Sequence, residues 1–203
     1  MKFNLANRLT LARIVLVPFF SIFIVYPVFT YEHTTWSHIV AAAVFILAAI
    51  TDFLDGKIAR SRKIVTRFGK FIDPLADKFM IFGAMISVCA SDFIIPDDLA
   101  VPRWLLYNVF LWTTFIIVFR ELAVTSMRLV VSRESGITVA ANSLGKIKTV
   151  SQFLCIIIIL LEPIVLPTQG FLSLIMTIVA AAFTIWSGIN YIRSYWDFLD
   201  PEN

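Results

Sequence analysis

The chain has 203 residues, of which 59% are hydrophobic and 15% are charged, and its formal net charge is +3. A soluble domain of this length carries about a quarter charged residues, whereas here the mean hydropathy is +0.86. Long apolar runs recur along the whole sequence, with no linker or repeat between them. The composition therefore excludes an ordinary soluble domain and predicts an all-α integral membrane protein with a single domain over residues 1–203.

Six apolar segments follow one another along the chain, each near or above the ~20 residues that a helix needs to cross a bilayer. They cover residues 8–29, 34–60, 70–91, 103–131, 143–164 and 170–195. Prolines and polar residues fill the gaps between them. The pattern predicts six transmembrane helices. Because the links are short and the number of helices is even, both termini should lie on the same side of the membrane.

The basic residues indicate which side that is. Of the 17 Lys and Arg residues, only Arg103 falls on the side opposite the termini. Connections rich in Lys and Arg stay in the cytoplasm, so both termini and the charged stretch 51–78 are predicted to be cytoplasmic. The basic excess is thus mainly a signal of topology, with some attraction for anionic lipid head groups. Nothing in the sequence supports binding to nucleic acid.

Acidic residues stand at the cytoplasmic ends of the second and third segments. An apolar run over 39–50 ends just before Asp52, and Asp77 comes just before a mostly apolar run over 79–90. Counted from Thr34, Asp52 lies about 27 Å along a helix, which is the depth of the lipid head groups. Charges at such a depth usually face a bundle interior or a watery cavity and mark function. We therefore expect a polar cavity that opens to the cytoplasm.

Helical spacing groups these carboxylates into two pairs. Asp52 and Asp55 share one face of the second helix, and Asp73 and Asp77 share one face of the third. Pro74 is tolerable if it falls in the first turn of the third helix. Two antiparallel neighbours with a short connection would bring the pairs together. Four adjacent carboxylates repel one another unless cations join them. Their oxygen atoms suit Mg²⁺ or Mn²⁺, and two such ions are a usual device for displacement at phosphorus.

Gly56 and Ala59 lie on the same helical face as the first pair and leave almost no bulk beside it. Small residues of this kind often serve close helix packing in membranes. Next to the acidic face, the hypothesis we favour is a groove in which a flat or bulky ligand lies close to the backbone.

These residues together resemble a known signature. The pattern D-x2-D-G-x2-A-R-x8-G-x3-D-x3-D resembles, at every defined position, the motif of the CDP-alcohol phosphatidyltransferase family. In this sequence its members are Asp52, Asp55, Gly56, Ala59, Arg60, Gly69, Asp73 and Asp77. The resemblance implies a six-helix membrane fold, usually a homodimer, in which an alcohol displaces CMP from a CDP-linked donor.

The resemblance also implies a role for each member of the motif. Asp52, Asp55 and Asp73 would hold the divalent ions that bridge the donor pyrophosphate. Asp77 would lie near the ions as a further ligand, and would be the general base that accepts the proton of the attacking hydroxyl; a role as metal ligand alone is the alternative. The nucleotide pocket would be formed by Gly56 and Ala59 as the cytidine floor, completed by Arg60 and Gly69.

Other parts of the chain resemble one branch of this family, in which bacterial enzymes use CDP-diacylglycerol and glycerol 3-phosphate at the inner (plasma) membrane. The likeness covers residues 119–149 and the N-terminal N-x-L-T-x2-R with Pro18. The side chains that could clamp the acceptor phosphate are Arg120, Arg128, Lys146 and Lys148. The two lysines could instead be topology anchors. Possible donor or lipid contacts come from Asn7, Thr10 and Arg13.

Several alternatives stay open or are disfavoured. Relatives with the same donor motif use inositol phosphate, phosphatidylglycerol or serine as the acceptor, and a phosphate clamp argues only against serine. An intramembrane prenyltransferase also uses aspartates and Mg²⁺ on a diphosphate, but its acidic motifs lack the Gly–Ala–Arg element. A cation transporter would place its ligands near the middle of the membrane, between repeats.

Overall fold

The computed structural model describes residues 5–26, 34–61, 66–91, 101–134, 143–165 and 168–196. Side chains are described for these ranges except at 5, 6, 34, 35, 53–61, 67, 70, 132–134 and 143. Within the described ranges the chain forms six helices and confirms the predicted all-α organisation. They are α1 (Leu5–Val25), α2 (Thr34–Ser61), α3 (Arg67–Ala90), α4 (Arg103–Glu134), α5 (Ser143–Val165) and α6 (Phe171–Ser194).

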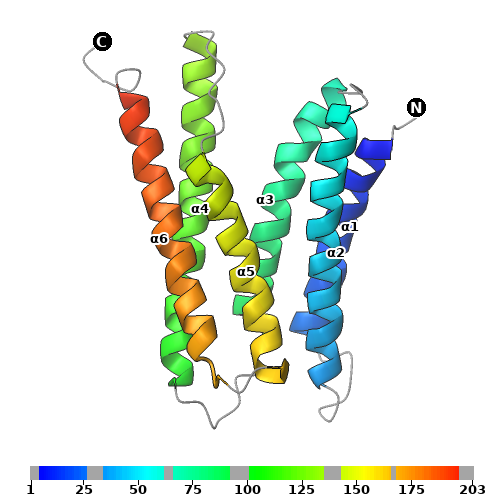
Figure 1. Ribbon diagram of the computed structural model, residues 1–203, viewed down its shortest axis with the longest axis vertical. Coiled ribbons are helices and arrows are strands. Elements are labelled where there is room, and N and C mark those ends of the chain that lie inside the picture. The colour runs from blue at the N-terminus through cyan, green and yellow to red at the C-terminus, as the bar shows by residue number, and fades with distance from the viewer. Residues whose placement is uncertain are drawn as a thin grey trace.

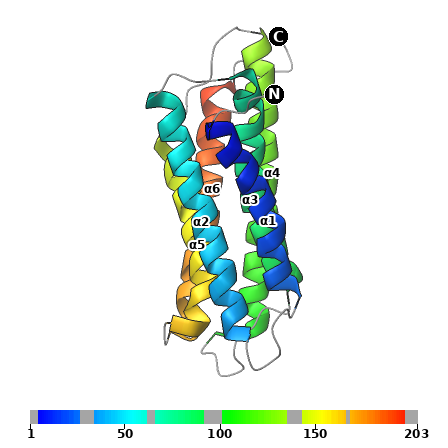
Figure 2. The same ribbon diagram turned by 90° about the vertical axis from the view of Figure 1, so that its right-hand side faces the viewer.

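The helices form two halves that follow the order of the chain (Figure 1). In the first half α1 packs against both α2 and α3, and in the second half α6 packs against both α4 and α5. Contacts of α2 with α5 and of α3 with α4 join the halves. The two halves spread apart toward the end of the molecule where both chain termini lie, and Figure 2 shows the helices running along the same long axis.

Three of the described helices are long and apolar enough to cross a membrane, over Asn7–Val25, Leu144–Val165 and Phe171–Ser194. These stretches lie in α1, α5 and α6. The apolar part of α2 is shorter, Trp36–Asp52. The charges of α3 lie in its first half, whereas α4 carries charges at its start and throughout its second half. The chain is therefore a membrane protein, while crossing by all six helices stays a prediction.

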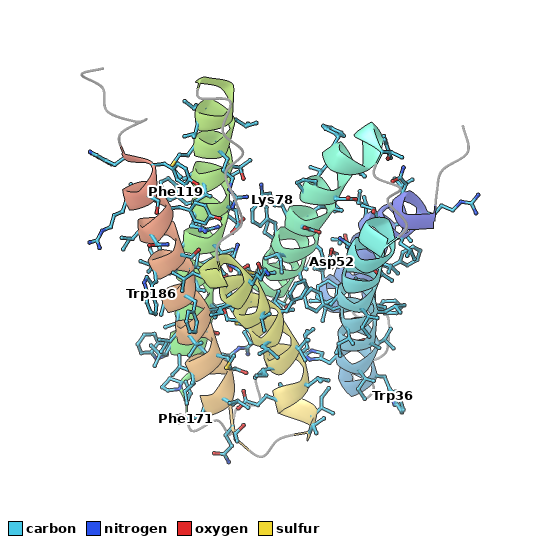
Figure 3. The ribbon with its side chains drawn as sticks, turned by 45° about the horizontal axis from the view of Figure 1, so that its top comes forward. Trp36, Asp52, Lys78, Phe119, Phe171 and Trp186 are labelled. Atoms are coloured by element: carbon cyan, nitrogen blue, oxygen red, sulfur yellow. The ribbon has the colours of Figure 1, made fainter. Side chains whose placement is uncertain are left out.

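The surface and the interior of the bundle differ as expected for such a protein. Large apolar side chains such as Trp36, Phe119 and Trp186 are exposed and point away from the bundle (Figure 3). Small and polar residues line the buried face of α6 instead, which allows neighbouring helices to approach closely. That face consists of Ser173, Thr177, Ala180, Thr184, Ser187, Gly188 and Tyr191.

Several predicted helix boundaries were wrong by a few residues, and two of them have a clear physical cause. The third helix begins at Arg67 instead of residue 70, because the Thr66 hydroxyl caps it by accepting a hydrogen bond from the Gly69 N–H at 2.9 Å. Pro74 consequently lies inside the helix and not in its first turn. The first helix ends at Val25 instead of residue 29, since Tyr26 precedes a proline in the sequence and this position disfavours helical dihedrals.

At the end opposite the chain termini, Glu162 of α5 joins α5 to α6. Its side chain is 1% exposed. One carboxylate oxygen accepts hydrogen bonds from the Ser173 N–H at 2.6 Å and from the Ser173 hydroxyl, and the other accepts from the Leu172 N–H at 3.1 Å and the Thr168 hydroxyl. The carboxylate therefore satisfies the first N–H groups of α6, which have no partner within their own helix.

Candidate active site

The predicted carboxylates are tied together by one face of α1. The Thr10 hydroxyl donates a hydrogen bond to Asp73 Oδ1 at 2.9 Å. Arg13 Nη1 contacts Asp52 Oδ1 at 2.6 Å and Asp77 Oδ1 at 2.7 Å. Arg13 and Thr10 are each only 1% exposed. Their side chains are thus buried among the predicted metal ligands and not turned to lipid, whereas contact with a donor stays a prediction.

Asn7, one turn nearer the start of α1, meets the N-terminal end of α3. Its side-chain amide donates to the Thr66 hydroxyl at 3.2 Å. A Cβ atom on Gly69 would lie 3.1 Å from Asn7 Oδ1 and 3.2 Å from Thr66 Oγ1. A glycine at this position therefore allows α1 and α3 to approach closely. This packing does not test the predicted contact of Gly69 with a nucleotide.

The aspartates meet by a different route from the one expected. Direct packing of the second and third helices was the prediction, but α2 and α3 touch little and α1 packs against both. The motif side chains of Asp55, Ala59 and Arg60 lie outside the described residues, as does the surrounding of Gly56, although their backbone belongs to α2.

The carboxylates that are described suit a hard cation in their chemistry. Asp52 and Asp77 offer oxygen atoms only, and their Oδ1 atoms are close enough to share one nitrogen of Arg13. Among the side chains that the structure describes, no group of three or more His, Cys, Asp or Glu is placed to hold a metal ion. Asp55 is not among those side chains, so the metal site stays a prediction.

A cavity of about 760 Å³ lies between the two halves. Asp52, Asp77 and Lys78 line it from α2 and α3, and Lys78 lies between the halves in Figure 3. All four predicted phosphate-binding residues line it from α4 and α5, namely Arg120, Arg128, Lys146 and Lys148. The fold thus brings two aspartates of the acidic motif, Asp52 and Asp77, to one cavity with basic residues that are more than 40 positions away in sequence.

Arg120, Arg128, Lys146 and Lys148 form the basic wall of the cavity. Ion pairs and hydrogen bonds hold this wall in place. Glu121 Oε1 accepts from Arg120 Nη1 at 3.0 Å and also from Lys148 Nζ. Lys78 on α3 donates across the cavity to the Thr125 hydroxyl on α4. Because the four basic residues that line the cavity from α4 and α5 outnumber the single carboxylate on their side, Glu121, this wall carries net positive charge and suits an anion.

The sequence profile of the CDP-alcohol phosphatidyltransferase family matches residues 3–186. The chain belongs to this family. A relative from Bacillus subtilis strain 168, named CDP-diacylglycerol–glycerol-3-phosphate 3-phosphatidyltransferase, is 40% identical over 210 aligned residues, which cover 99% of this chain and 100% of the relative. Relatives with the same name are 32% identical in Yersinia enterocolitica, over 99% of this chain and 100% of the relative, and in Shigella flexneri, over 96% of each.

The cavity of this phosphatidyltransferase includes residues that the sequence reasoning missed. Lys78 and Glu121 could have been found, because each is a charge at the border of a long apolar stretch. Ser187 and Tyr191 on α6 contact the arginines of the basic wall. Serine and tyrosine are common in membrane helices, so neither residue gave a signal in one sequence.

Proposed function

We propose that this phosphatidyltransferase transfers the phosphatidyl group of CDP-diacylglycerol to glycerol 3-phosphate, releasing CMP and forming phosphatidylglycerol phosphate. The observation that carries the proposal is the one cavity in which Asp52 and Asp77 face a wall of basic side chains. The relatives named for this reaction, matched over nearly their whole length, support the choice of donor and acceptor.

In the proposed reaction the acceptor hydroxyl attacks the phosphorus that carries the diacylglycerol. A new P–O bond forms, the P–O bond to CMP breaks, and CMP leaves with the electron pair. Asp77 accepts the hydroxyl proton; its side chain is 56% exposed on the cavity side of α3, and Arg13 holds its Oδ1. This orientation would aim the carboxylate at a bound acceptor.

Divalent metal ions are part of the proposal. Asp52, Asp55, Asp73 and Asp77 would hold two Mg²⁺ or Mn²⁺ ions, which would offset the charge of the donor pyrophosphate and polarise its phosphorus. Arg13 and Thr10 would keep three of these carboxylates in place through the contacts described above.

The two substrates would occupy different parts of the cavity. The cytidine would lie on the motif residues of α2, with Gly69 nearby, while the acyl chains extend into lipid past the apolar lining, which includes Ile81, Phe82 and Phe153. The acceptor phosphate would be bound by the basic wall. We also propose that all six helices cross the plasma membrane, that the cavity opens to the cytoplasm, and that the chain works as a homodimer.

Release of CMP tests the proposal directly. The purified chain in detergent, with Mg²⁺ or Mn²⁺ and CDP-diacylglycerol, is given glycerol 3-phosphate, inositol phosphate, phosphatidylglycerol or serine in parallel. We expect CMP with glycerol 3-phosphate only, and none from an Asp77→Asn variant. Positive charge on the wall does not by itself distinguish glycerol 3-phosphate from inositol phosphate, which makes that arm the sharpest comparison. Turnover with serine and not with glycerol 3-phosphate would refute the acceptor assignment.

A further inference from the structure

The basic wall depends on α6, although α6 contributes a single residue to the lining of the cavity. That residue is Tyr191, which is 4% exposed. The guanidinium carbon of Arg120 lies 5.4 Å from the centroid of its ring, and that of Arg128 lies 4.8 Å from it. Cations at such distances are attracted by the face of an aromatic ring. One tyrosine therefore positions both arginines of the predicted phosphate clamp.

Hydrogen bonds to α6 then orient each guanidinium. Arg128 Nη2 donates to the Tyr191 hydroxyl. Arg120 Nη2 donates to the Ser187 hydroxyl at 2.6 Å, while its Nη1 is held from the other side by Glu121. Ser187 and Tyr191 are four positions apart and share one face of α6. This face of α6 thus fixes the orientation of both guanidinium groups.

Gly188 gives Arg120 the room to lie against this face. A Cβ atom at Gly188 would stand 3.1 Å from Arg120 Cγ, so the aliphatic part of the arginine lies directly on the α6 backbone. Here the absence of a side chain serves a close approach and not a special backbone angle. On α6, the Ser187 hydroxyl, the space left by Gly188 and the Tyr191 ring therefore fit the Arg120 side chain.

The held arginines still have donors to offer. The contacts above use Arg120 Nη1, Arg120 Nη2 and Arg128 Nη2 as donors. Each of these nitrogens carries two N–H groups, so a second N–H remains on each. Phosphate oxygens are the acceptors that an arginine fork fits best. The pair is therefore oriented by α6 and keeps donors for an anion.

We propose that Ser187, Gly188 and Tyr191 are positioning residues for the acceptor phosphate, acting through Arg120 and Arg128. This inference rests on the proposed function, because it requires an acceptor that carries a phosphate. It makes α6, which holds none of the predicted site residues, a determinant of acceptor affinity.

The test is the kinetics of the full-length chain with Tyr191→Phe, which removes one hydroxyl and keeps the ring. The loss of a hydrogen bond to a charged group should raise the KM for glycerol 3-phosphate roughly tenfold. The KM for CDP-diacylglycerol and kcat should stay within about twofold of the wild type. Tyr107→Phe makes the same change on an exposed residue of α4 that does not line the cavity, and it should change none of the three constants.

Ser187→Ala provides an independent arm if Tyr191→Phe does not fold, with the same expected rise in the acceptor KM. The inference is overturned if the variants leave the acceptor KM unchanged, if donor and acceptor KM rise together, or if kcat alone falls. Failure of the proposed function has a different signature, because the wild-type chain itself would then release no CMP with glycerol 3-phosphate.

Discussion

Arg13 shows how a single buried charge can organise three helices. It belongs to α1, yet it contacts Asp52 of α2 and Asp77 of α3 through the same nitrogen. Burying a charge is tolerable only when it is paired, and here the pairing also sets the orientation of two predicted metal ligands. The guanidinium thus supplies positive charge where repulsion between the two carboxylates would otherwise be largest.

Replacing Arg13 by Gln should therefore destabilise the chain most strongly when divalent ions are chelated. Asp52 and Asp77 are 35% and 56% exposed, so the loss should be smaller than the ~3–5 kcal/mol of a fully buried ion pair; it should appear as a lower melting temperature in detergent with EDTA. Added Mg²⁺ or Mn²⁺ should restore more stability to Arg13→Gln than to the wild type, because the cations can take over part of the missing charge.

Arg8→Gln is the matched control, since Arg8 lies on the same helix and is exposed. It should melt like the wild type with and without the ions. If Arg13→Gln does not fold, Arg13→Lys keeps the charge but loses the fork and should show the same ion dependence in weaker form. An equal response of Arg13 variants and wild type to Mg²⁺ would contradict the role of Arg13 as a counter-charge.

At the scale of the element, helix positions could be predicted well and helix ends less well. The long apolar runs predicted six helices because apolar residues must be buried or face lipid. The start of α3 was missed because it depends on one hydroxyl, that of Thr66, which caps the helix only when the backbone brings it to Gly69. Single threonines are too common in sequences to signal such a cap.

Glu162 links two elements, and its removal should show as lost stability. Glu162→Gln replaces one carboxylate oxygen with an amide NH₂ group, which cannot accept the two hydrogen bonds that this oxygen receives. We expect the free energy of unfolding in detergent to fall by about 1–3 kcal/mol. CMP release by the folded fraction should stay at the wild-type level, because Glu162 does not line the cavity.

Thr168→Val is the control at the same turn, because it deletes only one of the donors to this carboxylate. Its effect on the free energy of unfolding should be smaller than that of Glu162→Gln. Equal stability of Glu162→Gln and the wild type would mean that water satisfies the start of α6 as well as the carboxylate does.

For the whole molecule, the sequence pattern could show which face of each helix is buried but not which helix packs against it. The spacing of the aspartates predicted that their carboxylates lie close together; the structure brings Asp52 and Asp77 to Arg13 and the cavity, whereas Asp73 contacts Thr10 and does not line it. The spacing could not predict that α1 would connect them, because a helical pattern shows which side is buried and not which helix covers it. The same limit explains why Tyr191 was missed, since its partners are Arg120 and Arg128, more than 60 positions earlier.

The proposed orientation in the membrane is testable by thiol labelling. Cys89 and Cys155 are first replaced by Ala, and a single cysteine is then placed at Lys146, an exposed residue of the cavity lining, or at Thr168, at the α5–α6 turn. In intact cells without an outer membrane, an impermeant thiol reagent should label the cysteine at 168 and reach the one at 146 only after lysis. The reverse result would invert the positive-inside assignment.

The division of the cavity between two consecutive halves of the chain separates two kinds of chemistry. The carboxylates of the motif come from α2 and α3, and the basic side chains of the lining come from α4 and α5 apart from Lys78. Under the proposed assignment, changes confined to α4, α5 and α6 would alter which alcohol is accepted and would leave the carboxylates proposed for donor cleavage intact. In evolution, such a chain would change its product through substitutions in the last three helices, while purifying selection conserves the first three.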